Sequence, residues 1–392
     1  MDKCLTGLQE RVPAGIIAAP CWLLAMPRMK PSRPRAKSED SGTPVTAAAR
    51  ASSRVQMEDI ARVAGVSRST VSRALSRSPR VNLKTRERVE EIARSLNYSI
   101  NVGASNLRLQ RNRTVAVVLP LDSATRQHVT DPFFISMLGN LADTLTARGY
   151  DMLLSRIDAD QLNLAGDLAA SGRAIGIIMI GQWHHHDQLN ELASRHAPIV
   201  VWGARMPEQK YCSVGSDNVA GGMLATEHLI ASGCRRIAFL GDTGLPEIWR
   251  RYEGYTSALD KHGIPKTAEL IRNVPFVEGG ARAAVKALLD QRLKFDGIFA
   301  GSDMLAMEAV SALRERGLGI PDDVAIVGYD DIILARYSHP ALTTIRQPVS
   351  EGADAMVESL LKIIDGKRPR SQVLPTELIV RESTLRTGAT AR

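Results

Sequence analysis

Residues 57–75 read MEDIARVAGVSRSTVSRAL and decide the fold of the N-terminal part of the chain. The stretch predicts two short amphipathic helices, because each half carries apolar residues at helical spacing: Ile60, Val63 and Ala64, then Val71, Ala74 and Leu75. Gly65 permits the left-handed backbone that ends the first helix. Ser67 is suited to cap the second helix, since its hydroxyl accepts a bond from an exposed N–H group. This is the layout of a helix-turn-helix, whose second helix enters the major groove of DNA.

A third helix is predicted after Asn82, its candidate cap, with an apolar face of Val89, Ile92, Ala93 and Leu96. We assign the resulting all-α headpiece to residues 54–99. The net charge of the chain is +8, and residues 51–113 alone hold 13 Lys and Arg against 5 Asp and Glu. Such a basic module supplies the sequence-independent attraction to phosphates that precedes specific readout.

The first 53 residues are expected to be a disordered extension. Their weak apolar run is broken by Pro20 and Pro27, and the basic cluster follows the run instead of preceding it. A signal peptide has the opposite order, and a membrane span needs about 20 apolar residues. An arm that contacts DNA or a membrane is the alternative.

The four cysteines, Cys4, Cys21, Cys212 and Cys234, form no C-x-x-C pair, which favours reduced thiols in a cytoplasmic protein.

From residue 114 the pattern changes to alternating apolar strands and amphipathic helices. Strands are predicted at 115–119, 151–154, 175–180, 199–202, 237–240, 297–300 and 324–328, and helices near 133–148, 186–196, 218–232, 250–262, 280–291, 303–316 and 349–365. This alternation is typical of parallel sheets with helices on both faces. Residues 114–385 are long enough for two such lobes, with 386–392 as a tail. Ligands of these sheets bind at the carboxyl ends of the strands, which here predicts a cleft between the lobes.

Residues 55–120 resemble the lactose-repressor/galactose-repressor family of bacterial transcription regulators, and the resemblance extends over nearly all of 55–385. The N-terminal residues that carry it are Asp59–Ala61, Ala64–Ser67, Thr70–Arg73, Val81, Thr85–Arg86, Val89, Asn97–Tyr98, Asn101, Ala104, Leu107 and Arg113–Thr114. Further on they include Asp131–Phe134, Val214–Asn218, Arg251–Tyr255, Ser302–Asp303, Val327–Asp331 and Leu342–Ile345. The resemblance implies a sensor domain similar to periplasmic sugar-binding proteins.

For DNA binding, the second helix offers Arg68, Ser69 and Arg73, which match the positions that read operator bases in the family. Arginine bonds guanine O6 and N7 as a fork, and serine can serve either base. Thr70, Ser72 and Asn82 are better placed for phosphates, which fix the register. A merely solvated helix face is the alternative.

Residues 100–113 form a linker in which residues 101–108 resemble the family's hinge helix, a segment that orders on operator DNA. Asn101, Ala104 and Leu107 match its DNA-contacting positions, and Leu107 matches the leucine that wedges into the minor groove. Ile100 stands where the family commonly has proline. A plain linker is the alternative.

For effector binding, Asp303 and Arg251 match the family's ligand-contacting aspartate and arginine. Phe133, Phe134 and Phe276 are candidate stacking faces. The alternatives are core packing for the phenylalanines and a helix cap for Asp303. Two departures from the family's pattern lie near the expected cleft, at Gly203-Ala204-Arg205 and at Ser302.

Other patterns are less informative. His184–His186 are three adjacent histidines that cannot all reach one ion from a regular element, so we expect a solvent-exposed loop and no metal site. Gly221–Gly222 lacks the ending of a phosphate loop, and no nucleophile–base spacing is found. We therefore expect no enzyme and no cofactor.

The sequence predicts a homodimeric repressor that binds palindromic double-stranded DNA, responds to a small-molecule effector of the sugar class, and does not bind membranes. A regulator that requires a purine-like corepressor and a transport-type sugar-binding protein are the alternatives.

Overall fold

The computed structural model describes residues 56–75, 78–96, 112–121 and 129–386. The chain divides into two compact units, residues 1–99 and 100–392. The predicted extension at 1–53 and the predicted hinge residues Asn101, Ala104 and Leu107 lie outside the described residues. So do residues 387–392 of the predicted tail. These predictions therefore stay predictions.

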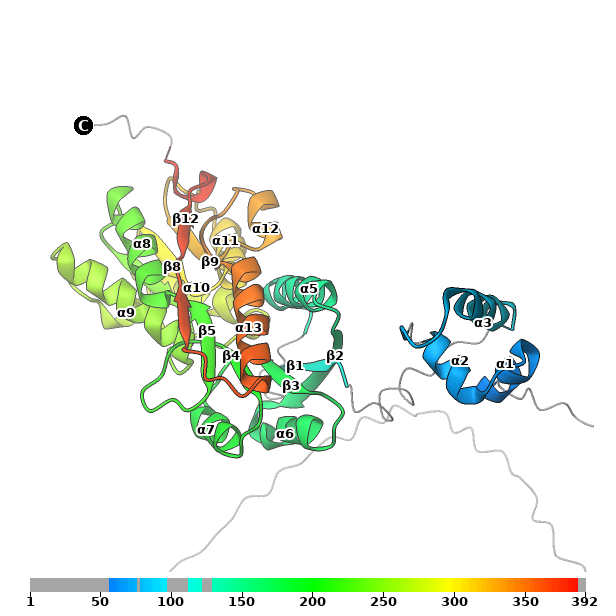
Figure 1. The fold of residues 1–392 in the computed structure, drawn as a ribbon. Helices are drawn as coiled ribbons and strands as arrows, with labels where there is room; N and C mark the ends of the chain where they lie inside the picture. Colours follow the sequence, from blue (N-terminus) through cyan, green and yellow to red (C-terminus); the bar gives the residue numbers. More distant parts are fainter. Residues whose placement is uncertain (1–55, 76–77, 97–111, 122–128, 387–392) are drawn as a thin grey trace, which may run out of the picture. The chain divides into compact units, whose positions relative to one another are not determined.

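The first unit contains helices α1 (Met57–Ala64), α2 (Arg68–Leu75) and α3 (Leu83–Ser95) (Figure 1). Gly65 ends α1 with a left-handed φ of 66°. Ser67 Oγ accepts a bond from the Thr70 amide at 3.2 Å, and Asn82 Oδ1 accepts one from the Thr85 amide at 2.8 Å. The predicted turn and both predicted caps are therefore confirmed.

A small core holds the three helices together. Its buried members are Ile60, Ala64, Val71, Ala74, Val81, Val89 and Ala93. The prediction that Val63 belongs to this core is wrong, because its side chain is 53% exposed. At 100° per residue, Met57 and Ala64 lie on one side of Ile60, whereas Val63 lies on the other side, toward solvent.

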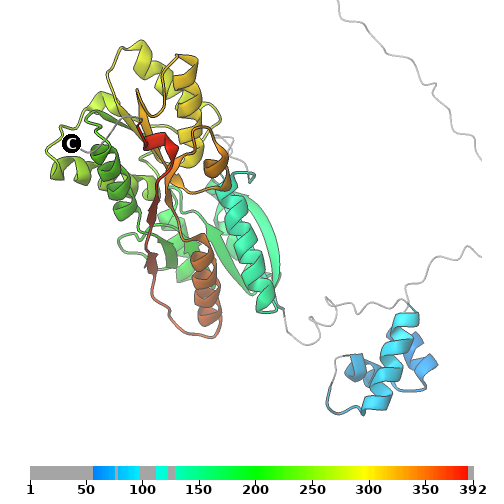
Figure 2. The ribbon, with the colours of Figure 1, turned by 90° about the horizontal axis from the view of Figure 1, so that it is seen from above.

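The second unit contains two six-stranded sheets, each of which forms one lobe (Figures 1 and 2). The sheet of the first lobe has the order β11 (Gln372–Leu374), β5 (Cys212–Ser216), β4 (Ile199–Trp202), β3 (Gly176–Ile180), β1 (Thr114–Leu121) and β2 (Asp151–Asp158). The sheet of the second lobe has the order β12 (Glu377–Ile379), β10 (Thr343–Arg346), β9 (Ala325–Asp330), β8 (Gly297–Ala300), β6 (Ile237–Leu240) and β7 (Ile271–Arg272). Neighbouring strands are parallel except for β10 and β12. The predicted two-lobed α/β architecture is confirmed.

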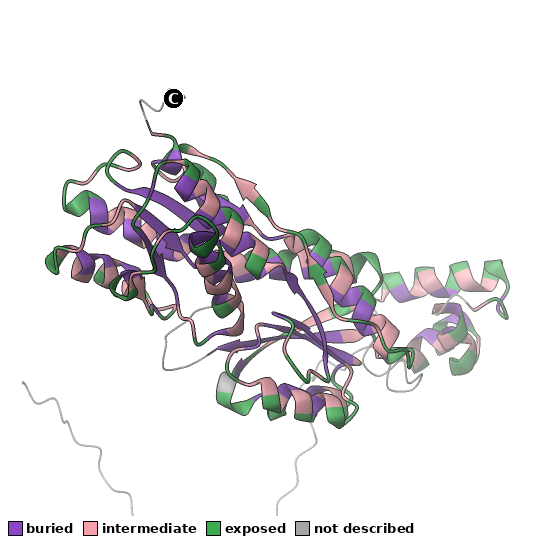
Figure 3. Cartoon of the chain, turned by 90° about the vertical axis from the view of Figure 1, so that its left-hand side faces the viewer, coloured by how far each residue is buried: buried purple, intermediate pink, exposed green. Residues whose placement is uncertain are grey.

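Helices cover both faces of each sheet. Those of the first lobe are α5 (Pro132–Ala147), α6 (Asn163–Ala170), α7 (His186–Ser194) and α13 (Val349–Ile364). Those of the second lobe are α8 (Asn218–Ala231), α9 (Pro246–Lys261), α10 (Gly280–Asp290), α11 (Asp303–Glu315) and α12 (Ile333–Tyr337). Successive strand residues enter opposite cores: Val115 and Val117 pack on one side of β1, and Ala116 and Val118 on the other. The central strands, such as β1, β3, β4, β6 and β8, are therefore buried on both faces, as Figure 3 shows, which is typical of parallel sheets.

The chain passes between the lobes three times, because β1–β5 and β11 belong to one sheet and β6–β10 and β12 to the other. The crossings follow β5, β10 and β11. Consequently α13, which follows the strands of the second lobe, packs in the core of the first lobe through Met356, Val357 and Leu360.

Helices α8 and α9 pack with their backbones in contact. A Cβ atom added at Gly222 would overlap the carbonyl oxygen of Arg251, and one added at Gly254 would overlap that of Val219. Only glycine allows this approach, which fixes where α9 presents its side chains to the cavity described below.

We predict that Gly254→Ala lowers the free energy of unfolding by about 1–3 kcal/mol, the usual effect of overpacking, because the obstructing atoms are backbone. Chemical denaturation with urea measures the change. Gly139→Ala is the matched control, since Gly139 is an exposed residue of α5 with no atom near the added Cβ. That variant should be stabilised by up to about 1 kcal/mol through helix propensity. Equal stability of Gly254→Ala and the wild type would contradict the close packing.

Candidate functional site

The exposed face of α2 carries the predicted base-reading residues. Arg68, Ser69 and Arg73 are exposed, while Val71 and Ala74 on the opposite side are buried. The guanidinium of Arg68 pairs with Glu58 of α1 at 2.8 Å, with both side chains about half exposed. The structure therefore brings the three residues to one accessible surface of the headpiece.

Polar residues next to this face make hydrogen bonds at the N-terminal ends of α2 and α3. The hydroxyls of Ser69 and Thr70 both lie 2.9 Å from Ser67 Oγ. Ser72 is partly buried on α2. Asn82 is exposed, and because its Oδ1 caps α3, its Nδ2 is the side-chain group that can donate outward. Residues of this kind suit phosphate contacts, which position a headpiece on DNA.

A second candidate site is a cavity of about 100 Å³ between the two lobes, here called the effector cavity. It lies at the carboxyl ends of β3, β4, β8 and β9, where parallel sheets bind ligands. Its lining residues are Asp131, Phe133, Phe134, Ile180, Gly181, Gln182, Trp183, Trp202, Leu245, Glu247, Ile248, Arg251, Phe276, Ser302, Asp330 and Gln347. Four of the five residues predicted for effector binding, Phe133, Phe134, Arg251 and Phe276, are among them.

Arg251 is held from several sides at the floor of this cavity. Its Nε donates to Asn218 Oδ1 at 2.9 Å, and its Nη1 donates to the carbonyl oxygen of Gly301. The guanidinium carbon lies 3.6 Å from the ring centroid of Tyr329, and Nη1 lies 3.8 Å from Oδ1 of Asp330. A buried arginine with this set of partners is fixed in one orientation.

Asp330, at the end of β9, is a lining residue that the sequence analysis did not select. Burial raises the pKa of its carboxyl group to about 7, although the nearby Arg251 opposes the rise. Its φ of 115° is unusual for any residue other than glycine, and Asp331 follows with a φ of 55°. The sequence feature that could have identified Asp330 is an acidic residue at the carboxyl end of a buried strand. Asp131, Gln182, Trp183, Trp202 and Glu247 also line the cavity and were not predicted.

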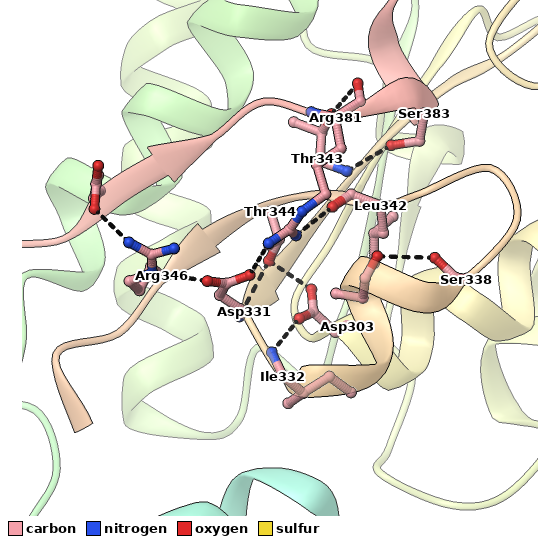
Figure 4. A network of polar contacts seen from close by, with 12 residues as sticks. Asp303, Asp331, Ile332, Ser338, Leu342, Thr343, Thr344, Arg346, Arg381 and Ser383 are labelled. Carbon is pink, nitrogen blue, oxygen red and sulfur yellow. Dashed lines mark hydrogen bonds and ion pairs between the residues drawn. The ribbon is translucent and has the colours of Figure 1, made fainter. Parts of the chain in front are cut away.

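A polar network behind Asp330 holds this strained segment (Figure 4). Asp331 Oδ1 accepts a bond from Arg381 at 2.5 Å, and Asp331 Oδ2 accepts one from Arg346 Nε at 2.7 Å. Gln347 Nε2 donates to Asp330 Oδ1 at 2.7 Å. Two arginines therefore hold the residue after Asp330, and Gln347 holds the carboxyl group of Asp330 itself.

Asp303, the fifth residue predicted for effector binding, does not line the effector cavity. Its side chain is fully buried, and its carboxylate accepts bonds from the Thr344 hydroxyl at 2.5 Å and from the Ile332 amide at 2.9 Å. A Cβ atom at Gly328 would overlap its Oδ1, so the carboxylate lies against β9 and not in the cavity. Nor does Asp303 cap α11, because Ser302 Oγ accepts the bond from Leu305. Asp303 instead positions the segment next to Asp330.

The histidine cluster shows no metal-binding arrangement. His186 is the first residue of α7, and its Nδ1 lies 2.9 Å from the hydroxyl of Tyr211. His184 is exposed. Within the described ranges, no three His, Cys, Asp or Glu side chains are grouped to hold a metal ion. In the same ranges, no helix has the length and apolar character that crossing a membrane requires.

Comparison with known proteins identifies both parts of the chain. Residues 56–101 match the family model described as bacterial regulatory proteins of the lacI family, and residues 226–384 match the periplasmic binding protein-like domain. The transcriptional regulator CelR of Thermobifida fusca is 33% identical over 338 residues, which cover 84% of this chain and 98% of that protein. The chain belongs to the lacI family. It is therefore a helix-turn-helix transcriptional regulator, as the sequence predicted.

Solved structures of lacI-family proteins share the architecture. A cellobiose complex of the regulator CelR is 31% identical, covers 84% of this chain and all of that one, and superposes with a TM-score of 0.64. A lacI-family regulator from Enterococcus faecium with bound ribose is 29% identical over 69% of this chain and 98% of that one, with a TM-score of 0.60. The relative CelR is described as a helix-turn-helix transcriptional regulator and not as an enzyme.

We predict that the buried carboxyl groups make stability depend on pH. Burial raises the pKa values of Asp303 and Asp330, so between about pH 4 and about pH 7 the folded protein holds protons that the unfolded chain has released. The free energy of unfolding should therefore fall as pH rises through this window. Denaturation at a series of pH values measures the slope, and Asp330→Asn should flatten it. Asp365→Asn, at the exposed end of α13, is the control that should keep it.

Proposed function

We propose that this regulator is a repressor whose affinity for a palindromic operator is controlled by a sugar or sugar derivative in the effector cavity. The observation that carries the proposal is that both lobes line this cavity with aromatic rings and carboxylates. Aromatic rings fit the apolar face of a sugar, and carboxylates accept bonds from its hydroxyls. The cellobiose complex of CelR and the ribose-bound regulator from Enterococcus faecium support a ligand of this class.

We assign base reading to Arg68, Ser69 and Arg73, and phosphate contacts to Thr70, Ser72 and Asn82. The hinge roles of Asn101, Ala104 and Leu107 remain proposals for residues outside the described ranges. One headpiece reads one half-site, so a palindromic operator calls for a homodimer. The assigned role is that of a cytoplasmic protein without catalytic residues or a cofactor.

The size of the effector cavity supports a switch in lobe geometry. At about 100 Å³ it is smaller than the roughly 300–1,000 Å³ of common ligand pockets, so the lobes separate to admit a ligand. A ligand that binds one lobe arrangement more tightly shifts the equilibrium toward it. The predicted hinge runs directly into β1 of the first lobe. A change in that lobe can therefore alter how readily the hinge forms on DNA, which couples the two sites.

We predict that Arg73→Ala weakens specific operator binding by about 1–3 kcal/mol, the contribution of one forked contact to a base. Fluorescence anisotropy with labelled operator and with a scrambled duplex separates base reading from phosphate attraction. Binding to the scrambled duplex should change much less. An unaltered ratio of the two affinities would contradict a base-reading role.

We predict that Arg251→Lys abolishes the ligand response and leaves operator binding intact, because lysine cannot reproduce the forked contacts to Asn218 and Gly301. A thermal-shift screen of sugars, polyols and purines finds ligands, and a gel shift with each ligand measures the response. Arg250→Lys is the control, since Arg250 pairs with Glu253 outside the cavity.

Weaker operator binding with a sugar supports an inducible repressor, whereas tighter binding with a purine supports the corepressor alternative. A normal response of Arg251→Lys would remove Arg251 from the effector site.

A further inference from the structure

Several hydrogen-bond donors around the effector cavity are engaged by the protein itself. Arg251, the one Arg or Lys among the described lining residues, donates to Asn218 and to Gly301. Gln182 Nε2 donates to the Ala204 carbonyl at 2.6 Å and lies 2.9 Å from the Tyr211 hydroxyl. Gln347 Nε2 donates to Asp330. Both N–H groups of the Gln182 amide are therefore engaged, whereas Arg251, with five N–H donors, uses its Nε and Nη1 for the protein and can still donate to a ligand through Nη2.

Acceptors, by contrast, face the cavity with spare capacity. The side-chain oxygen of the fully buried Gln182 has no hydrogen-bond partner in the described part of the chain. Asp131 lies at the start of α5 and accepts bonds there from the Phe133 amide, at 2.9 Å, and from the Phe134 backbone. Glu247 extends from the first turn of α9, and Asp330 lies at the end of β9. Backbone amides already donate to Glu247, and Gln347 donates to Asp330, but a carboxylate has about four acceptor positions, so these groups can accept further bonds from a ligand.

The charge of the lining is also unbalanced. Three carboxyl groups, from both lobes, face one guanidinium. Burial raises the pKa of Asp131, Glu247 and Asp330, because the guanidinium does not compensate for the loss of water around three carboxylates. A ligand that brings positive charge would restore their ionised form, whereas an anion would add a fourth negative group.

From this arrangement we infer that the effector cavity selects sugars by charge: a protonated amino sugar binds more tightly than its neutral parent, and the corresponding sugar acid or sugar phosphate binds least. The inference rests on the proposed sugar effector and adds its chemical class. The ammonium group donates to Gln182 and the carboxylates, and the rings of Trp183 and Trp202 offer faces for a cation. Carboxylate and phosphate groups can make none of these contacts.

Matched series of ligands test the inference on the full-length protein. Glucose, glucosamine, glucuronate and glucose 6-phosphate are compared with the four galactose counterparts by calorimetric titration at pH 7. Within a series the ring is constant, so the order of the dissociation constants reports the effect of charge. We expect the amine to bind at least tenfold more tightly than the acid and the phosphate, with the neutral sugar between them.

Two variants identify the groups responsible. Glu247→Gln and Asp131→Asn each remove one carboxylate and should reduce the preference for the amine over the acid by at least threefold. Asparagine still caps helices, so α5 keeps its N-terminal acceptor in the second variant. Glu253→Gln, on the same helix as Glu247 but paired with Arg250 outside the cavity, should keep the wild-type preference.

The possible failures are distinguishable. Acids or phosphates that bind as tightly as amines would overturn charge selection and leave the sugar effector standing. The same holds if Glu247→Gln and Asp131→Asn both retain the full preference. If no member of either series binds, while a purine does, the proposed sugar effector is wrong, and this inference is wrong with it.

Discussion

The stacking of the Arg251 guanidinium on Tyr329 is the contact on which the sensor depends. A buried charged group is tolerated only when its hydrogen-bond donors find acceptors. The guanidinium of Arg251 donates to Asn218 at the start of α8 and to the carbonyl of Gly301 just after β8. The close approach of α8 and α9 at their glycines brings Arg251 within reach of both. One side chain thus joins two helices and two strands beneath the cavity.

The second lobe supplies a rigid floor for the cavity. Asp330 is held in an unusual backbone conformation by the salt bridges of Asp331 and by the bond that the Ile332 amide donates to Asp303. Groups that are fixed before a ligand arrives bind it with less loss of conformational freedom. The first lobe contributes aromatic surface from α5 and from the ends of β3 and β4. Opening of the lobes would therefore move this aromatic surface away from Arg251 and Asp330 of the second lobe.

Sequence patterns predicted the elements that carry continuous apolar runs. The strands at 199–202, 237–240 and 297–300 were predicted with the bounds that the structure has. Strands β5 and β10 were not predicted, because their serine, glycine and threonine residues interrupt any apolar run. They are buried because neighbouring strands and helices pack against them. The short helices α6 and α12 were missed as well.

The candidate site was harder to predict, because a carboxylate near a strand end can face either the cavity or the protein. Asp303 and Asp330 both follow buried strands. Only the bonds from Thr344 and Ile332 show that Asp303 faces inward. Glu247 and Asp131 come from different lobes, so no local pattern could bring them together. Val63 is apolar, as a core residue of the headpiece would be, but it lies outside the narrow face of α1 that is buried by the other helices.

The position of α13 has a consequence for synthesis of the protein. The core of the first lobe contains Met356, Val357 and Leu360, and its sheet ends in β11, so that lobe lacks a helix and a strand until the chain has been made as far as residue 374. A nascent chain on the ribosome can complete the headpiece early, because the contacts of that unit lie within residues 1–99. DNA-binding ability thus precedes ligand sensing during translation, and a truncated product would retain a headpiece without the means to control it.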